Sequence, residues 1–554
     1  MSAPEKSERG HHAPVLRSVS VVSAMTAISR LGGLVREMAM AHFFGTSALK
    51  SAFDIAFTLP NLFRRLFGEG ALSSAFVPVF SETLEKEGRE QARVFAMRVI
   101  SLLALALGVL TLGGILLSYP LARVLPPESR WLLPLPMMRI MLPYALLICV
   151  AALVAGMLNT LGKFAVSSFT PFLLNAIWIL TLVGICPFLR DDPGFRVTVL
   201  SWMILLAGLA QIAFQLPALH RHGFRFGLCW SGIFGDPRLR RVLILMGPAA
   251  LGMGLIQVNV CVDKLLAYWA DTAAPAALEY AERIVYLPLG MFGTAFMTVL
   301  LPTFSRQASR GDHHAMRQTL ERAMRNMMLI MAPCSAGLLV LALPCIEMIY
   351  RTKGGAFDPE SAVLSARALA AYAPGLLVFS FHKALVPAFY GLQDLKTPLR
   401  VSLFGLLLNV TLNVTSVILL PHGWKHTGIA ASTVLTSAVN GLTLAVILRR
   451  RIGAPCAGGV LKTLAKAAAA AALAAVIAYA THTMLGRILP ALAGEGARKL
   501  TQVCAVSGAV LAAALAYGAL ALAFMRGELM EMINEFRHRR DAGSAGSAGL
   551  PPCN

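Results

Sequence analysis

Four arginines lie inside the long apolar stretch between Ser29 and Ser81. They are Arg30, Arg36, Arg64 and Arg65. A charged side chain at the centre of a bilayer costs about 2.5–3.5 kcal/mol on insertion scales, so four of them would cost roughly 10 kcal/mol. That cost is tolerable where the arginines line a wet cavity walled by protein, which is the environment that we expect for this stretch.

Three acids in the same stretch neutralise the arginines only in part. They are Glu37, Asp54 and Glu69. The excess of positive charge predicts a cavity that binds an anion. Two structural alternatives stand beside this hypothesis, because an arginine in a membrane often extends its head group to the interface or forms a structural ion pair.

The spacing of the arginines limits which of them can face the same cavity wall. Successive residues of a helix point about 100° apart, so Arg64 and Arg65 cannot both face it. Arg30 and Arg36 are six residues apart in the chain, or about 120° around a straight helix. The glycines at 32 and 33 suggest a bend that turns both arginines inward.

The elements that position these residues are predicted to be membrane-spanning helices. The chain has 554 residues, of which 57% are hydrophobic and 14% charged, and its mean hydropathy is +0.67. A soluble protein carries closer to about 25% charged residues. We therefore expect an all-α polytopic membrane protein. Its fourteen predicted spans lie near residues 17–44, 49–81, 94–119, 137–160, 168–189, 197–219, 240–270, 276–305, 323–350, 365–391, 399–420, 427–448, 463–485 and 500–525.

A short internal sequence repeat divides these spans into two halves. Leu59-Pro60 precedes the run VPVFS, and Leu287-Pro288 precedes LPTFS. The repeat predicts two six-span lobes, an N-lobe at 17–219 and a C-lobe at 240–448, repeated in parallel as in other transporter folds. The other predicted parts are an N-terminal segment 1–16, a linker 220–239, two extra spans within 449–525 and a flexible tail 526–554.

The second half also carries charged and polar residues within its spans. Arg283, with Glu282 beside it, lies at the level of the first-half arginines in the repeat. Asp263 with the pair Asn409 and Asn413 offers a carboxylate and two amide oxygens, a hard-oxygen set that binds a small cation. The alternatives are a structural pair of Asp263 with the adjacent lysine and contacts of the asparagines with the backbone.

The positions of the lysines and arginines predict the orientation of the chain. The formal net charge of +21 is compatible with nucleic-acid binding. The basic residues, however, are concentrated in alternate loops, as membrane topology requires. Basic residues within a few positions of a span end are counted with the adjoining loop. On that count, loops and termini on one side hold 28 of the 49 basic residues, those on the other side hold 13, and 8 lie deeper within spans. The positive-inside rule places both termini in the cytoplasm, and we expect no nucleic-acid partner. Residues 1–16 do not have the pattern of a cleavable signal peptide.

Three long motifs resemble the MurJ (MviN) family of lipid II flippases, within the multidrug/oligosaccharidyl-lipid/polysaccharide (MOP) exporter superfamily. They are SRLGGLVRE, LPNLFRRLFGEGALSSAFVP and AERIVYLPLG, and the resemblance covers nearly the whole chain. It implies a transporter in the bacterial cytoplasmic membrane that moves lipid II, the undecaprenyl-diphosphate-linked peptidoglycan precursor, from the inner to the outer leaflet by alternating access. Lipid II, membrane lipids and the peptidoglycan synthesis machinery are the expected partners.

The resemblance also assigns roles to residues. It implies that Arg30, Arg36, Arg64 and Arg283 hold the diphosphate, with Arg65, Glu69 and Glu282 as further members of the site. It places a sodium site at Asp263, Asn409 and Asn413, and a groove for the lipid tail beside the last two spans. No cofactor is expected, and coupling to sodium or to the membrane potential is left open. Relatives often carry an acid at Ser51 and a lysine at Thr58, so this chain departs from the family in its finer electrostatics.

Two rival functions are compatible with a polytopic membrane protein. The first is another exporter of the same superfamily, either a polysaccharide-lipid flippase or a cation-coupled drug exporter. A cavity that exports cationic drugs should be net acidic, whereas this one is predicted to be net basic. The second is a membrane-embedded glycosyltransferase or acyltransferase, but the sequence shows no HExxH motif, no GxSxG motif and no phosphate-binding glycine loop.

Overall fold

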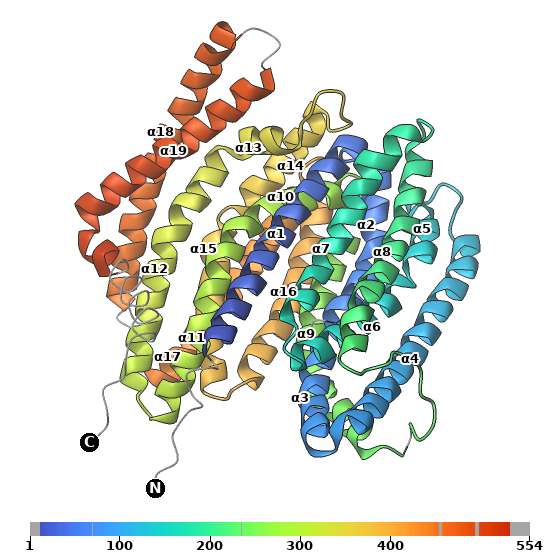
Figure 1. Ribbon diagram of the computed structural model, residues 1–554. Helices are drawn as coiled ribbons and strands as arrows, with labels where there is room; N and C mark the ends of the chain where they lie inside the picture. The colour runs from blue at the N-terminus through green and yellow to red at the C-terminus, as the bar shows by residue number, and fades with distance from the viewer. Residues whose placement is uncertain (1–11, 69, 234, 454–456, 494–497, 532–554) are drawn as a thin grey trace. The chain divides into compact units, whose positions relative to one another are not determined.

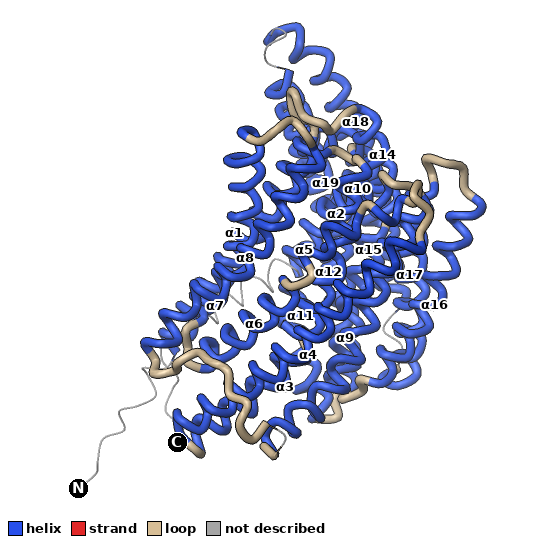
Figure 2. Tube along the Cα trace, turned by 90° about the vertical axis from the view of Figure 1, so that its right-hand side faces the viewer, coloured by secondary structure: helices blue, strands red, loops and turns tan. Residues whose placement is uncertain are grey.

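The computed structural model describes residues 12–531 except 69, 234, 454–456 and 494–497 (Figure 1). Every regular element in this part of the chain is a helix, and Figure 2 shows no strand in it. The prediction of an all-α polytopic protein is therefore confirmed. The chain divides into two compact units, Met1–Ala276 with Lys353–Asp358, and Ala277–Thr352 with Pro359–Asn554.

The first unit contains the helices that carry the first-half arginines. In chain order they are α1 (His12–Phe44), α2 (Ala48–Phe63), η1 (Arg64–Gly68), α3 (Ala71–Lys86), α4 (Gly88–Val124), η2 (Arg130–Leu132), α5 (Pro134–Met141), α6 (Tyr144–Thr160), α7 (Phe164–Leu180), η3 (Thr181–Ile185), η4 (Cys186–Phe188), α8 (Pro193–Arg221) and α9 (Pro237–Ala270). Its core is largely aliphatic and includes an aromatic cluster, in which Phe53 and Phe57 both meet Trp178 edge to face.

The second unit contains the remaining helices. They are α10 (Ala274–Pro288), which begins at the boundary, then η5 (Leu289–Gly293), α11 (Thr294–Ser309), α12 (His313–Val340), α13 (Ala342–Tyr350), α14 (Pro359–Tyr372), α15 (Gly375–Gly391), α16 (Lys396–Leu419), α17 (Lys425–Ile452), α18 (Ala457–Ala493) and α19 (Arg498–Phe524). The boundary between the units follows α9, because α9 packs against α2 and α3 of the first unit. The predicted lobes would instead place this helix in the second half.

Local sequence explains where several helices begin. Asp192 and Asp236 accept hydrogen bonds from the backbone N–H groups of Gly194 and Arg238, and a proline follows each aspartate. An aspartate at the N-cap satisfies a free N–H group of the first turn, and proline is favoured at the next position because its missing N–H would be unused there. These two sites set the starts of α8 and α9.

A proline precedes a π-helical turn in both units. Pro60 lies four residues before η1, and Pro288 lies directly before η5. Proline lacks an N–H donor and its ring clashes with the carbonyl of residue i−4, so the regular hydrogen-bond ladder is broken there. A π-helical turn follows each proline, and such turns often occur at functional sites. In the first unit the turn contains Arg64 and Arg65.

Eight helices in the described part are long and apolar enough to cross a membrane, or ten if each of two bent helix pairs is one span. These ten correspond to ten of the fourteen predicted spans. The other four correspond to α1, to α2 with α3, to α9 and to α10 with α11. Those helices carry the charged candidate residues. Two of these four spans contain a π-helical turn, η1 between α2 and α3 and η5 between α10 and α11. The number fourteen stays a prediction.

The last two helices, α18 and α19, pack against each other and against α12 (Figure 1). Alanines form much of the α18 side of this contact, and small side chains allow helices in a membrane to approach closely. Glu528, just beyond α19, lies 3.3 Å from Nζ of Lys466 and 3.9 Å from Nη2 of Arg325. Residues 526–531 are helical. The rest of the flexible tail predicted for 526–554 lies outside the described residues, so that assignment stays a prediction.

Candidate functional site

Arg36, on α1, is held by three side chains. Its Nε and Nη2 atoms donate to Oε1 of Glu37 at 3.2 and 2.6 Å, and Nη1 donates to Oδ1 of Asn175 at 3.3 Å. The guanidinium carbon lies 4.3 Å from the centre of the Trp178 ring. A planar cation held by a carboxylate, an amide and an aromatic face keeps a defined direction. Arg36 is thus oriented by its surroundings and is not a mobile surface cation.

Helix α7 supplies Asn175 and Trp178, which the sequence analysis did not single out. The two residues are three apart, so they share one face of α7, and α1 packs along this helix. Asn175 donates from Nδ2 to the carbonyl of Ser29 at 3.1 Å, and Trp178 donates from Nε1 to Sδ of Met40 at 3.2 Å. Both side chains are buried. An asparagine and a tryptophan three residues apart within an apolar span could have indicated from the sequence that this face of the helix contacts a charged residue.

Lys50, at the start of α2, is a buried cation that the sequence analysis did not include in the site. Its side chain is 1% exposed, and its Nζ donates to both carboxylate oxygens of Asp54 at 2.6 Å. The same Nζ lies 3.8 Å from Oε2 of Glu37. The formal charges of Arg36, Glu37, Lys50 and Asp54 therefore sum to zero. The spacing of Lys50 and Asp54, four residues apart on one helix, could have revealed the pair.

The other first-half arginines have different environments. Arg64 donates from Nε to Oδ1 of Asn61 at 2.9 Å, whereas Arg65 donates from Nη1 to Oε1 of Gln257 on α9 at 3.4 Å. Arg30 is exposed, and among the described residues no carboxylate lies within ion-pair distance of it. Glu69 lies outside the described residues. Helix α1 continues as a regular α-helix through the two glycines between Arg30 and Arg36.

Arg283 and Glu282 lie on α10, within the second compact unit. Nη2 of Arg283 is 4.0 Å from Oε1 of Glu279, one turn earlier on the same helix. The side chain of Arg283 is 33% exposed, so part of its guanidinium is accessible. The structure thus places the second-half arginine beside two acids, of which only Glu282 was singled out from the sequence.

The predicted cation ligands lie in two different units. Asp263, on α9 of the first unit, accepts from Nδ2 of Asn259 at 3.3 Å through its Oδ2. Asn409 and Asn413, on α16 of the second unit, are buried, and Nδ2 of Asn413 donates to Oδ1 of Asn409 at 2.9 Å. No group of three or more His, Cys, Asp or Glu side chains with metal-binding geometry occurs among the described residues. The assignment of a sodium site to these three residues stays a prediction.

The two positions at which the resemblance led us to expect charged residues contact the backbone. Oγ of Ser51 accepts from the backbone N–H of Ala276 at 3.4 Å, and Oγ1 of Thr58 donates to the carbonyl of Asp54 at 2.6 Å. Helix α2 nevertheless carries an acid and a lysine, at Asp54 and Lys50. These two charges pair with each other on that helix.

The loop before α9 is tied to α4 by ionic contacts. Asp236 accepts from Nη1 of Arg98 at 2.8 Å and from Nε of Arg238 at 2.9 Å. Nε of Arg98 also donates to the carbonyl of Ser231 at 2.8 Å. Burial raises the pKa of the Asp236 carboxyl, but the hydrogen bonds from Arg238 and Arg98 outweigh this effect and lower that pKa to about 2. Part of the predicted linker 220–239 is therefore anchored to the first unit.

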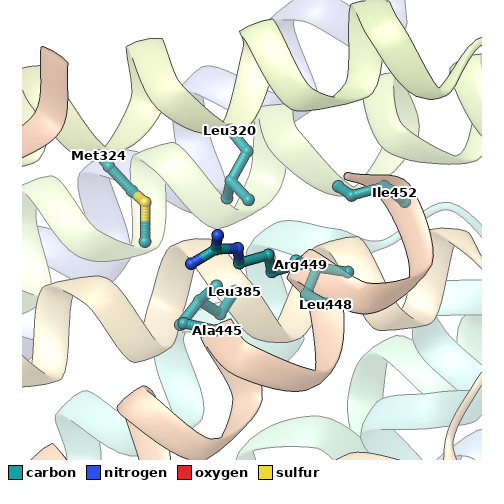
Figure 3. A pocket seen from close by; sticks show the side chains of 7 residues that line it. All are labelled: Leu320, Met324, Leu385, Ala445, Leu448, Arg449 and Ile452. Atoms are coloured by element: carbon teal, nitrogen blue, oxygen red, sulfur yellow. The ribbon is translucent and has the colours of Figure 1, made fainter. Parts of the chain in front are cut away.

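A small hollow in the second unit does not match any predicted site. Figure 3 shows its lining by α12, α15 and α17, which is apolar except for Arg449. Its volume of about 20 Å³ is little more than the space one water molecule requires. This hollow is far too small for a lipid head group.

Solved structures define the fold of this chain. The structure described as lipid II flippase MurJ in an inward closed conformation matches with a TM-score of 0.72 and 23% identity, over 92% of this chain and 99% of that one. An inward-facing multidrug resistance MATE family transporter of the MOP superfamily matches with a TM-score of 0.62 and 16% identity, over 80% of this chain and 99% of that one. The chain therefore has the fold of the MOP-superfamily membrane transporters.

Sequence comparison defines the family. The profile of the family "Lipid II flippase MurJ" matches residues 40–491. A probable lipid II flippase MurJ of Vibrio cholerae is 34% identical, over 77% of this chain and 81% of its own length. The lipid II flippase MurJ of Burkholderia cenocepacia is 32% identical, over 79% of this chain and 84% of its own length. This chain belongs to the lipid II flippase MurJ family, as its motifs predicted.

Proposed function

We propose that this chain is a flippase that moves lipid II from the inner to the outer leaflet of the bacterial cytoplasmic membrane. Membership of the MurJ family supports lipid II as the substrate and a transporter rather than an enzyme. The excess of lysines and arginines in alternate loops supports a cytoplasmic position for both termini. The hydrophobic helices support a multi-pass protein embedded among membrane lipids.

The observation that carries this proposal is a set of arginines on the helices of a membrane fold. Arg36 is oriented by α7, Arg64 lies in the π-helical turn η1, and Arg30 is exposed on α1. Arg283 is their counterpart in the second unit. A guanidinium binds phosphate oxygens through two parallel hydrogen bonds, so these four arginines suit a diphosphate. Arg65, Glu69 and Glu282 adjoin these binding residues.

The proposed transport cycle is alternating access between two sides of the membrane. Two compact units exist in the chain, and each has a proline followed by a π-helical turn where a helix can bend. The surface of α18 and α19 would carry the polyprenyl tail. This surface exposes apolar side chains, among them Leu473, Val476, Leu511 and Leu515. The enzymes that assemble peptidoglycan would use the translocated product and are the expected protein partners.

Cation coupling is a separate part of the proposal. Asp263, Asn409 and Asn413 offer oxygen donors of the kind that sodium prefers, and the two asparagines are buried. Substitution of Asp263 by Asn should remove any dependence of transport on sodium. If transport never depends on sodium, or the variant keeps the dependence, these residues serve only as structural pairs and the membrane potential becomes the candidate energy source.

Flipping by the purified protein tests the proposed function directly. Full-length protein is reconstituted into vesicles that contain fluorescent lipid II, and the fraction of lipid II accessible to an external quencher is followed. We expect protein-dependent equilibration of lipid II between leaflets without chemical change to the lipid. Turnover of the lipid-linked sugar would favour a glycosyltransferase, and absence of both flipping and turnover would contradict the proposal.

A drug exporter is the second candidate, because MATE transporters share the fold. Transport of a cationic dye by the same vesicles would support it. The arginine set argues against it, because a cationic substrate would be repelled by Arg30, Arg64 and Arg283.

A further inference from the structure

Glu37 lies between two cations that contact opposite oxygens of its carboxylate. Oε1 accepts from Nη2 of Arg36 at 2.6 Å, and Oε2 lies 3.8 Å from Nζ of Lys50. Glu37 is 2% exposed and Lys50 is 1% exposed, so water does not screen these charges effectively. The carboxylate is therefore shared by an arginine assigned to the substrate and a lysine that is buried behind it.

Lys50 has a second carboxylate within reach. Its Nζ donates to both oxygens of Asp54 at 2.6 Å. A movement of about 1 Å toward Glu37 would bring it to hydrogen-bond distance of that residue as well. An ammonium on a flexible four-carbon stem can make such a movement, because it acts as a point charge without the planar geometry of a guanidinium.

The availability of Arg36 to an anion depends on this arrangement. A guanidinium bound to a carboxylate offers an approaching diphosphate less positive charge than a free one. If Arg36 left Glu37 with no replacement, a buried carboxylate would lose its shortest ion pair, which is unfavourable. Lys50 can supply that replacement while Trp178 and Asn175 continue to orient the guanidinium.

We propose that Lys50 is a positioning residue that takes over Glu37 when Arg36 turns to the diphosphate of the substrate. When the substrate leaves, Arg36 returns to Glu37 and Lys50 returns fully to Asp54. This inference rests on the proposed function, because the diphosphate is that of the lipid-linked precursor. It makes the affinity for the diphosphate depend on two residues, Lys50 and Asp54, that do not touch it.

Binding measurements on the full chain in lipid nanodiscs test this exchange, with undecaprenyl diphosphate as the probe. Glu37→Gln weakens the competitor for Arg36, so binding should tighten by about tenfold, the effect of one charged hydrogen bond. The double variant Lys50→Met with Asp54→Leu removes the replacement cation and its partner together. Binding should then weaken by about tenfold, because Lys50 no longer offsets the charge of Glu37 when Arg36 leaves it. Adding Glu37→Gln to that double variant should restore binding at least to the wild-type level.

A purely structural cluster gives a different pattern. It predicts that the double variant binds as tightly as the wild type once folded, or that the triple variant stays as weak as the double. Either result overturns the exchange. If the double variant does not fold, Asp54→Asn replaces it, because this change commits Lys50 to Glu37 and should tighten binding. Unchanged or weaker binding by folded Asp54→Asn overturns the inference. Thermal unfolding identifies the folded variants, and failure of the wild-type protein to bind the probe would count against the proposed function itself.

Discussion

The guanidinium of Arg36 lies 4.3 Å from the centre of the Trp178 ring, and the tryptophan comes from a helix more than a hundred residues later in the chain. The ring is 4% exposed, so it forms a fixed wall behind the cation. A cation over an aromatic face gains about 0.5–2 kcal/mol, depending on how far water is excluded. This contact gives the arginine a preferred direction that its own helix could not impose.

Substitution of Trp178 by Leu should therefore weaken lipid II transport while the Arg36 charge is retained. Loss of the cation–π contact predicts a decrease in affinity of roughly 2- to 30-fold. Flipping at limiting lipid II is the measurement. Trp202→Leu is the matched control, because Trp202 lies on α8 and is 56% exposed. An equal loss in both variants would mean that tryptophan content, and not the position of Arg36, limits activity.

The helices could be predicted from the sequence because apolar runs and helix-starting residues are local signals. The predicted span 399–420 corresponds to Lys396–Leu419, and 197–219 corresponds to Pro193–Arg221. Such signals involve neighbouring residues only. They also explain why the motif-rich arginine stretch could be found without knowledge of any contact.

The partners of the arginines could not be predicted in the same way. Asn175 is 139 residues away from Arg36, and periodicity contains no information on which distant helices pack together. Lys50 was missed for a different reason, because a lysine at the edge of an apolar run resembles an interfacial loop residue. The charge count from the sequence included four arginines and three acids but not Lys50. The burial of Lys50 against Asp54 shows that this lysine belongs in the count.

Orientation in the membrane can be tested by cysteine labelling. Arg310→Cys and Lys353→Cys are introduced singly into a background without the native cysteines, and both positions are exposed in the structure. The distribution of basic residues predicts that position 310 reacts only from the cytoplasm and position 353 only from outside. A membrane-impermeant maleimide applied to intact and opened cells makes the distinction. The reverse pattern at either position would rule out the predicted orientation.

The Asp236 cluster predicts a pH dependence of stability. Because the pKa of the folded-state carboxyl is about 2, below its usual value near 4, the stabilisation is fully present above about pH 4 and is lost as pH falls toward 2. Asp236→Asn should remove on the order of 2 kcal/mol of stability at neutral pH and flatten the acid dependence. Unfolding in detergent between pH 2 and 7 measures both effects. Asp191→Asn is the control, because Asp191 pairs with Arg196 but is 94% exposed.

The pair α18 and α19 can be tested for a role in holding the lipid tail. Deletion of residues 460–554 removes both helices and exposes the face of α12 that carries Leu329 and Ala332. We expect the remaining helices to insert, with transport of long-chain polyprenyl substrates abolished. A short-chain diphosphate lipid is the control substrate, since it does not need the removed surface. Normal rates for full-length lipid II after the deletion would show that the tail binds elsewhere.

Arg→Lys substitutions at positions 30, 36, 64 and 283 separate charge from geometry. Lysine keeps the positive charge but lacks the planar fork that binds two phosphate oxygens at once. A charged hydrogen bond is worth about 1.5–3 kcal/mol, so losing one should weaken binding by roughly 10- to 150-fold. Arg→Ala should be worse at each position. Arg65→Ala should be milder than Arg64→Ala, because Arg65 contacts Gln257 whereas Arg64 contacts Asn61.

Growth of a depleted strain, with the membrane level of each variant measured, is the assay, and exposed Arg123→Ala is the control. Full growth with Arg30→Ala, Arg36→Ala and Arg283→Ala at normal protein levels would show that these arginines do not form the substrate site.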